Sequence, residues 1–212
     1  MANKNRKTQV HQANQQKVKQ QQYQAATKYL FIFPIIAAVL TLLALLPFFA
    51  NFAEVYNSQL DNPIEVAVRG WSFFVAGLTG DYSSPDAVYG DLAMPFYYYA
   101  QEWCETIAIV SIFAVVFIVL SVAVQAIAAI KKMHGLNLVS AILGLISAVL
   151  MIVCYAKGVG MANSDILPIY CSGNPACSIK SYAIISAIIL LAATAVSAFA
   201  AIKNMKVSKL LK

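Results

Sequence analysis

The four longest apolar runs of this chain contain no Asp, Glu, Lys or Arg. Proton relays and many coupled transporters need an ionisable residue within the membrane, so this absence argues against that class of protein. Histidine is also scarce, since His11 and His134 are the only two, and we expect each to be structural or solvated. The sequence shows no Ser/His/Asp set, no phosphate-binding glycine loop and no metal-ligand spacing. We therefore expect no catalytic site, no metal and no cofactor.

Acidic residues are few, and they are unevenly distributed. All nine lie in segments 54–105 and 157–180, whereas twelve of the fifteen Lys and Arg residues lie in segments 1–28, 131–137 and 203–212. Positive charge next to transmembrane helices marks the cytoplasmic side. The three basic segments, and with them both termini, are therefore predicted to be cytoplasmic, and the two acidic segments to lie on the outer side.

Long apolar runs dominate the rest of the sequence, and 60% of all residues are hydrophobic. About 20 apolar residues form a helix that crosses roughly 30 Å of hydrocarbon. The runs lack the alternation of barrel strands, so helices are favoured. We predict transmembrane helices at 29–53, 106–130, 138–156 and 181–202. The predicted fold class is an all-α integral membrane protein, a four-helix transmembrane bundle.

Segment 54–105 is too long for a simple connection between the first two helices. We expect it to form a small extracytoplasmic loop domain. Within it, Ile64–Arg69 partly alternates between apolar and charged residues, which favours one or two short strands. An amphipathic helix that pairs Glu65 with Arg69 is the alternative, and the sequence leaves both open.

Aromatic residues are concentrated in the same segment. Trp71, Phe73 and Phe74 must be covered by the loop domain, by lipid or by a partner, and exposed together they would form a contact patch. The aromatic stretch 96–99 and Trp103 precede the second predicted helix, where rings favour the headgroup region of a membrane. We interpret this second group as an interfacial belt.

Small and polar residues spaced four apart predict the inward faces of three helices. Such residues let helix backbones approach closely in lipid, where no hydrophobic force drives helices together. The candidates for helix packing are Ser121, Gln125, Ala129, Ser140, Gly144, Ala148, Ala193, Ser197 and Ala201. Gln125 is the most polar of them. We expect it to make a hydrogen bond between helices, with a permeation or ligand site as the alternative.

Two short motifs predict how helices begin, bend or end. Pro47 removes the hydrogen bond to the carbonyl of Leu43 and should bend the first helix near its outer end. In the basic turn at 131–137, Gly135 is suited to cap the second helix and Asn137 to cap the third. Helices two and three are thus predicted to form a tight antiparallel hairpin.

All four cysteines lie at or beyond the predicted outer edge of the membrane, where disulfides are permitted. Cys171 and Cys177 flank a Ser-Gly-Asn-Pro-Ala turn and are the first disulfide candidate. Cys104 and Cys154, near the outer ends of neighbouring helices, are the second. The connectivity stays open, since four cysteines allow three full pairings.

Two membrane protein families are similar in layout. Four helices with both termini inside and two outward cysteine pairs resemble the quinone-linked disulfide-generating proteins of bacterial membranes, which implies thiol oxidoreductase activity; their C-x-x-C pair at the second helix is reduced here to Cys104. Claudin-like proteins share the four helices and the long first and short second outer loop, but the first loop here has no cysteine before Cys104. Neither resemblance covers a motif.

The leader 1–28 carries eight glutamines, six cations and no acidic residue, which suits contact with anionic lipid headgroups but does not indicate nucleic-acid binding. Our leading hypothesis is a non-enzymatic four-pass protein of a bacterial plasma membrane, a scaffold, accessory or partner-binding subunit of a membrane complex. Its expected partners are the lipid bilayer and either another membrane protein or further copies of itself. The alternatives are a passive or accessory transport component and, second, a membrane thiol-disulfide oxidoreductase.

Overall fold

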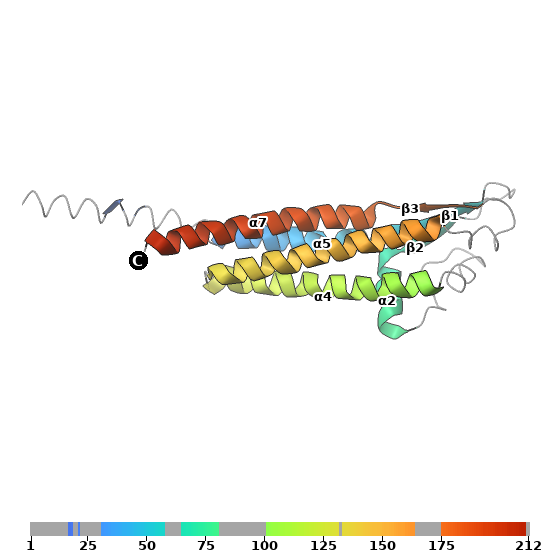
Figure 1. Ribbon diagram of the computed structural model, residues 1–212, viewed down its shortest axis with the longest axis horizontal. Coiled ribbons are helices and arrows are strands. Elements are labelled where there is room, and N and C mark those ends of the chain that lie inside the picture. The colour runs from blue at the N-terminus through green and yellow to red at the C-terminus, as the bar shows by residue number, and fades with distance from the viewer. Residues whose placement is uncertain are drawn as a thin grey trace, which may run out of the picture.

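The computed structural model of this 212-residue protein describes residues 17–18, 21, 31–57, 65–80, 101–131, 133–163 and 175–210. This part of the chain is mostly helical, with four helical segments long and apolar enough to cross a membrane. These segments are Phe31–Phe49, Glu105–Lys131, Gly135–Ala162 and Tyr182–Met205. They lie side by side as a bundle, with a short sheet at one end (Figure 1). We call this the strand end of the bundle and the opposite end, where α4 turns into α5, the turn end.

The first segment is an α-helix from residue 31 to residue 43 and then tightens into the 3₁₀-helix η1 (Leu46–Phe49). Pro47 has no N–H to donate to the carbonyl of Leu43, so the α-helical ladder stops there. Strand β1 (Asn51–Asn57) begins two residues after η1. The predicted first helix, 29–53, is therefore too long, because its last residues belong to the strand.

The other three long helices are α4 (Gln101–Lys131), α5 (His134–Ala162) and α7 (Tyr182–Leu210). Both α5 and α7 run further than the predicted 138–156 and 181–202. Helical hydrogen bonding continues past Lys157 and Lys203. A charged residue limits how much of a helix can lie in hydrocarbon, but it does not end the helix. The predicted hairpin of the second and third helices is present, with α4 ending at Lys131 and α5 beginning at His134.

The predicted caps in this hairpin are wrong. Met133 is the N-cap of α5, with no side-chain hydrogen bond, and Gly135 lies inside the first helical turn. Gly80 is the only described glycine with a positive φ, so Gly135 is not a left-handed cap. Asn137 is fully buried among the helices. The turn is too short for either residue to lie outside a helix.

Three strands form a small antiparallel sheet in the order β2-β1-β3. Strand β2 (Glu65–Arg69) occupies the segment for which the sequence left a strand and a helix open. Strand β3 (Pro175–Ile179) comes from the connection between α5 and α7 and pairs with the other side of β1. Val55 of β1 is opposite Val66 on one side and Cys177 on the other. The sheet therefore ties the two interhelical segments together.

A short helix, α2 (Gly70–Thr79), follows β2 directly and lies across the bundle beside α4 (Figure 1). Its close approach depends on Gly77, because a Cβ there would lie 2.7 Å from the Cδ1 of Ile112 and 3.1 Å from the Cβ of Ala108. The helix ends at Gly80, whose φ of 68° is the left-handed conformation that glycine adopts without strain.

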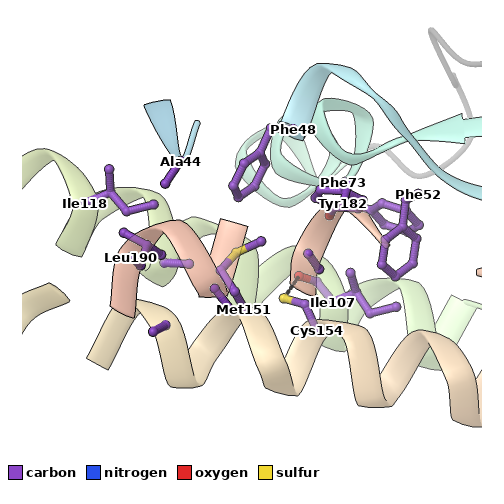
Figure 2. Packing of buried hydrophobic residues seen from close by; sticks show 14 of the residues in the cluster. Ala44, Phe48, Phe52, Phe73, Ile107, Ile118, Met151, Cys154, Tyr182 and Leu190 are labelled. Atoms are coloured by element: carbon purple, nitrogen blue, oxygen red, sulfur yellow. Dashed lines mark hydrogen bonds between the residues drawn. The ribbon is translucent and has the colours of Figure 1, made fainter. Parts of the chain in front are cut away.

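An aromatic cluster joins the sheet and α2 to the long helices (Figure 2). The ring of Phe52 lies 5.1 Å from that of Phe73 and 5.2 Å from that of Tyr182, and both pairs are edge-to-face. Phe48 meets Tyr182 at 5.7 Å. Gly158 of α5 gives room for this packing, since a Cβ there would lie 2.5 Å from the ring of Phe52. The core at the strand end is thus built from rings, and the rest of the bundle mainly from small residues.

Candidate functional site

The most polar buried region described is a cluster centred on Gln125 in α4. Gln125 is only 1% exposed, and its amide nitrogen Nε2 is a donor with three hydroxyl oxygens in reach. These are Thr41 Oγ1 of the first segment at 3.3 Å, Ser121 Oγ one turn away on α4 at 3.4 Å, and Ser197 Oγ of α7 at 3.2 Å. One side chain therefore links three of the four long helices.

The fourth helix joins through a pair of serines. The hydroxyls of Ser121 and Ser140 are 3.0 Å apart, and Ser121 also reaches the carbonyl oxygen of Ser140 at 3.2 Å. Since Ser140 belongs to α5, a continuous polar contact runs from the first segment through α4 to both α5 and α7. Thr41 donates its own hydrogen to the carbonyl of Ala37 at 2.7 Å, which leaves its oxygen as an acceptor for Gln125.

The structure buries every residue that the sequence assigned to helix packing. These residues are Ser121, Gln125, Ala129, Ser140, Gly144, Ala148, Ala193, Ser197 and Ala201. Gly144 lets α5 and α7 approach closely, because a Cβ at this position would lie 2.6 Å from Thr194 Oγ1. The stripes of small residues therefore lie between helices, and the large exposed side chains of the same helices lie on the outside of the bundle.

The cluster is electrically neutral and has more acceptors than its one amide can serve. Nε2 has two hydrogens for three hydroxyl oxygens, and the other amide atom, Gln125 Oε1, has no partner among the described residues. Hydroxyl and carboxamide groups do not ionise near neutral pH. The arrangement can therefore hold helices together or bind a neutral polar molecule by hydrogen bonds, but it offers no acid or base.

Two further buried amides lie towards the turn end. Asn137 is one turn from Ser140 on α5, and Asn204 is two turns from Ser197 on α7, so each lies on the face of its helix that carries the cluster. Both are buried, and neither amide has a hydrogen-bond partner among the described residues. A buried polar group without a partner costs about 1 to 3 kcal/mol. This half of the bundle is therefore more polar than helix packing alone requires.

Cys154 is a free, buried thiol. Its sulfur lies 3.6 Å from the hydroxyl of Ser111 and 3.9 Å from the carbonyl oxygen of Ile107, the contact drawn in Figure 2. The candidate disulfide between Cys104 and Cys154 is therefore not formed, because Cys154 faces the interior between α5 and α4. Cys171 and the side chains of Cys104 and Cys177 lie outside the described part of the chain, so the 171–177 bridge stays a prediction.

The three aromatic contact candidates separate into different environments. Phe73 is fully buried against Phe52, so of the three alternatives this ring is covered by the protein itself and is not a contact candidate: α2 turns this side of the helix towards the core. Trp71 is 39% exposed and stacks on the ring of Phe49 at 5.5 Å. Its ring also lies 4.9 Å from that of the half-buried Phe74. Only Trp71 and Phe74 remain available for contact with surroundings.

Sequence reasoning missed two polar residues that the structure makes important. Thr41 was missed because a single threonine in an apolar run forms no stripe. Ser186 of α7 donates to the carbonyl of Ala44 at 2.9 Å, an acceptor that the change to 3₁₀ geometry before Pro47 frees. Pro47 indicated that a carbonyl would be freed but not which helix would supply the donor.

A comparison with protein-family models and with curated proteins finds no match. Within the described residues, no group of three or more His, Cys, Asp or Glu side chains could hold a metal ion. The leader 1–28, apart from residues 17–18 and 21, the aromatic belt at 96–99 and the side chain of Trp103 fall outside the described residues, so the lipid contact of the leader stays a prediction. The buried cluster around Gln125 is therefore the candidate site on which a functional argument can rest.

Proposed function

We propose that the protein is a non-enzymatic, four-pass component of a bacterial plasma membrane that serves as a scaffold or partner-binding subunit of a membrane complex. The observation that carries this proposal is the hydrogen bonding of Gln125 to hydroxyls of three helices. Interhelical hydrogen bonds of this kind stabilise a bundle in lipid, where apolar surfaces gain nothing from association. The polar groups around Gln125 thus have a structural role that needs no substrate.

The proposed orientation places the turn end in the cytoplasm. Lys131 closes α4 at this end, and Lys203, Lys206 and Lys209 lie in the last turns of α7. Lys203 lies over the ring of Phe199 at 5.3 Å, as expected where a cation reaches back along the end of a membrane helix. The acidic residues of β1 and β2 lie at the strand end. This sorting of charge supports cytoplasmic termini.

The proposed site of partner binding is the strand end. The sheet fastens β3 to β1 and so makes one unit of two segments that lie far apart in the sequence. The aromatic cluster anchors this unit, which we call the head, to the helices. Because the head is fixed in place, it loses little conformational freedom on binding. Purification from native membranes in mild detergent should yield a stoichiometric protein partner or a stable homo-oligomer. A monomer without partners, even after chemical cross-linking in intact membranes, would contradict the proposal.

A passive or accessory transport role is the second candidate, favoured by one specific observation. Gln125 Oε1 and the amides of Asn137 and Asn204 are unpartnered among the described residues and lie on inward faces. Purified protein in liposomes distinguishes the two functions. Flux of a small solute or ion that Gln125→Leu abolishes would establish transport, whereas liposomes as tight as protein-free controls support the scaffold.

A further inference from the structure

The short helix α2 has an apolar surface that the described protein covers on one side only. Its sequence, Gly-Trp-Ser-Phe-Phe-Val-Ala-Gly-Leu-Thr, has no charged residue. Gly70, Ser72, Phe73 and Ala76 are buried on the side facing the bundle. On the other side Trp71 is 39% and Leu78 61% exposed within the described structure. Such a surface is unfavourable in water and needs an apolar environment.

The contacts of α2 place it near the strand-end limit of the apolar segments, not beyond them. Gly77 packs against Ala108 and Ile112, which lie three and seven residues inside the segment Glu105–Lys131. At 1.5 Å per residue these positions are about 5 and 10 Å from the segment's end. Trp71 stacks on Phe49, the last residue of the first segment. Both contacts put α2 at the depth where hydrocarbon gives way to headgroups.

The polar groups described for α2 suit this depth. Thr79 returns its hydroxyl to the carbonyl of Val75 at 3.0 Å, and the N–H of Gly80 bonds the carbonyl of Ala76 at 2.8 Å. Arg69, exposed at the N-cap, adds a cation of the kind that lipid phosphate groups attract. Tryptophan itself is enriched at the membrane interface, since its ring is apolar and its N–H is polar.

We propose that α2 lies in the boundary between the headgroups and acyl chains of the outer leaflet, with Trp71, Phe74 and Leu78 in contact with lipid. Lipid is the occupant because this surface continues onto Phe49 and Leu46, exposed residues of a helix that itself faces lipid. Interfacial helices bury an apolar face about 5 to 10 Å deep, which matches the contacts with α4. The inference rests on the proposed membrane placement and adds a lipid anchor to the head.

Tryptophan fluorescence tests the proposal on the full chain. The sequence has two tryptophans, so Trp103→Phe leaves Trp71 as the only tryptophan, whose emission is excited apart from that of the tyrosines. The variant is reconstituted in phosphatidylcholine vesicles with nitroxide-labelled lipid, the label lying either near the headgroups or near the bilayer centre. For a ring about 5 to 10 Å deep, the shallow label should quench roughly twofold more than the deep one, and aqueous iodide should quench little.

A matched control separates this proposal from the membrane placement on which it rests. The Trp71→Phe, Trp103→Phe, Phe113→Trp variant places the emitter at a 53% exposed position of α4, deeper in the segment. It should respond at least as strongly to the deep label as to the shallow one. If this control is quenched by lipid and Trp71 only by iodide, or by neither quencher, the lipid anchor is overturned and the membrane placement stands. If lipid quenches neither, both fail.

Discussion

The amide nitrogen of Gln125 lies 3.2 Å from the hydroxyl oxygen of Ser197, although 72 residues separate them in the chain. The contact crosses from α4 to α7, and the same nitrogen reaches Thr41 in the first segment. A hydrogen bond between side chains in lipid has an average worth of only about 0.6 kcal/mol. The main effect of the hydrogen bonds of Gln125 is therefore to specify which faces of three helices meet.

A double-mutant cycle measures this contact. Gln125→Leu and Ser197→Ala should each lower the free energy of unfolding, and the double variant should lose less than the sum by about 0.6 kcal/mol. Reversible unfolding in mixed detergent micelles provides the measurement. Ser147→Ala is the control, because the Ser147 hydroxyl bonds the carbonyl of Leu143 on its own helix and should show no coupling to Gln125. Strict additivity for Gln125 and Ser197 would refute the contact.

Gly144 should be essential for the contact between α5 and α7. In Gly144→Ala the new Cβ would lie 2.6 Å from Thr194 Oγ1, so the Thr194 side chain or the helices must shift and the free energy of unfolding should fall by about 1 to 3 kcal/mol. Thr194→Ala should restore most of the loss, since it removes the obstructing oxygen, which has no partner among the described residues. Gly135→Ala is the control. Nothing lies within 4 Å of that Cβ, so stability should hold or rise by about 0.5 to 1 kcal/mol.

The thiol of Cys154 should be inert in the folded protein. Burial between α5 and α4 keeps reagents away from it, and only the unfolded chain exposes it. In a variant with Cys104, Cys171 and Cys177 all changed to Ser, a maleimide should label Cys154 at least tenfold more slowly in mild detergent than in denaturing detergent, because reaction needs an accessible thiolate. Equal rates would show that the structure is wrong at this position and would revive the thiol redox hypothesis.

The buried amide of Asn137 distinguishes a structural bundle from one that binds a polar ligand. Because its two polar atoms have no partner among the described residues, Asn137→Leu removes a cost and should raise the free energy of unfolding by about 1 to 3 kcal/mol. Reversible unfolding in mixed detergent micelles provides the measurement. For Asn204→Leu we also expect the free energy of unfolding to rise. A loss of stability in either variant would mean that the amide has a bound partner, and would favour the transport hypothesis.

The prediction of four membrane-length helices follows from composition alone, and the structure confirms that four segments are long and apolar enough. The inward stripes of α4, α5 and α7 were also accessible to sequence reasoning, because a 3.6-residue period places residues four apart on one face. Helix ends were not. The caps at Gly135 and Asn137 failed because the same residue types suit a cap or a position inside a helix, and only the length of the connection decides.

The sequence by itself determined the apolar segments, the sorting of charge to their two ends and the inward faces of α4, α5 and α7, since all three depend on residues close together in the chain. Tertiary structure alone decided that Gln125 meets Thr41 and Ser197, that β3 pairs with β1 and that Phe73 turns inward while Trp71 does not. The physical reason is that periodicity fixes the direction of a side chain about its own helix axis. It carries no information on the register, rotation and order of neighbouring helices, which arise only when the small residues of all four pack together.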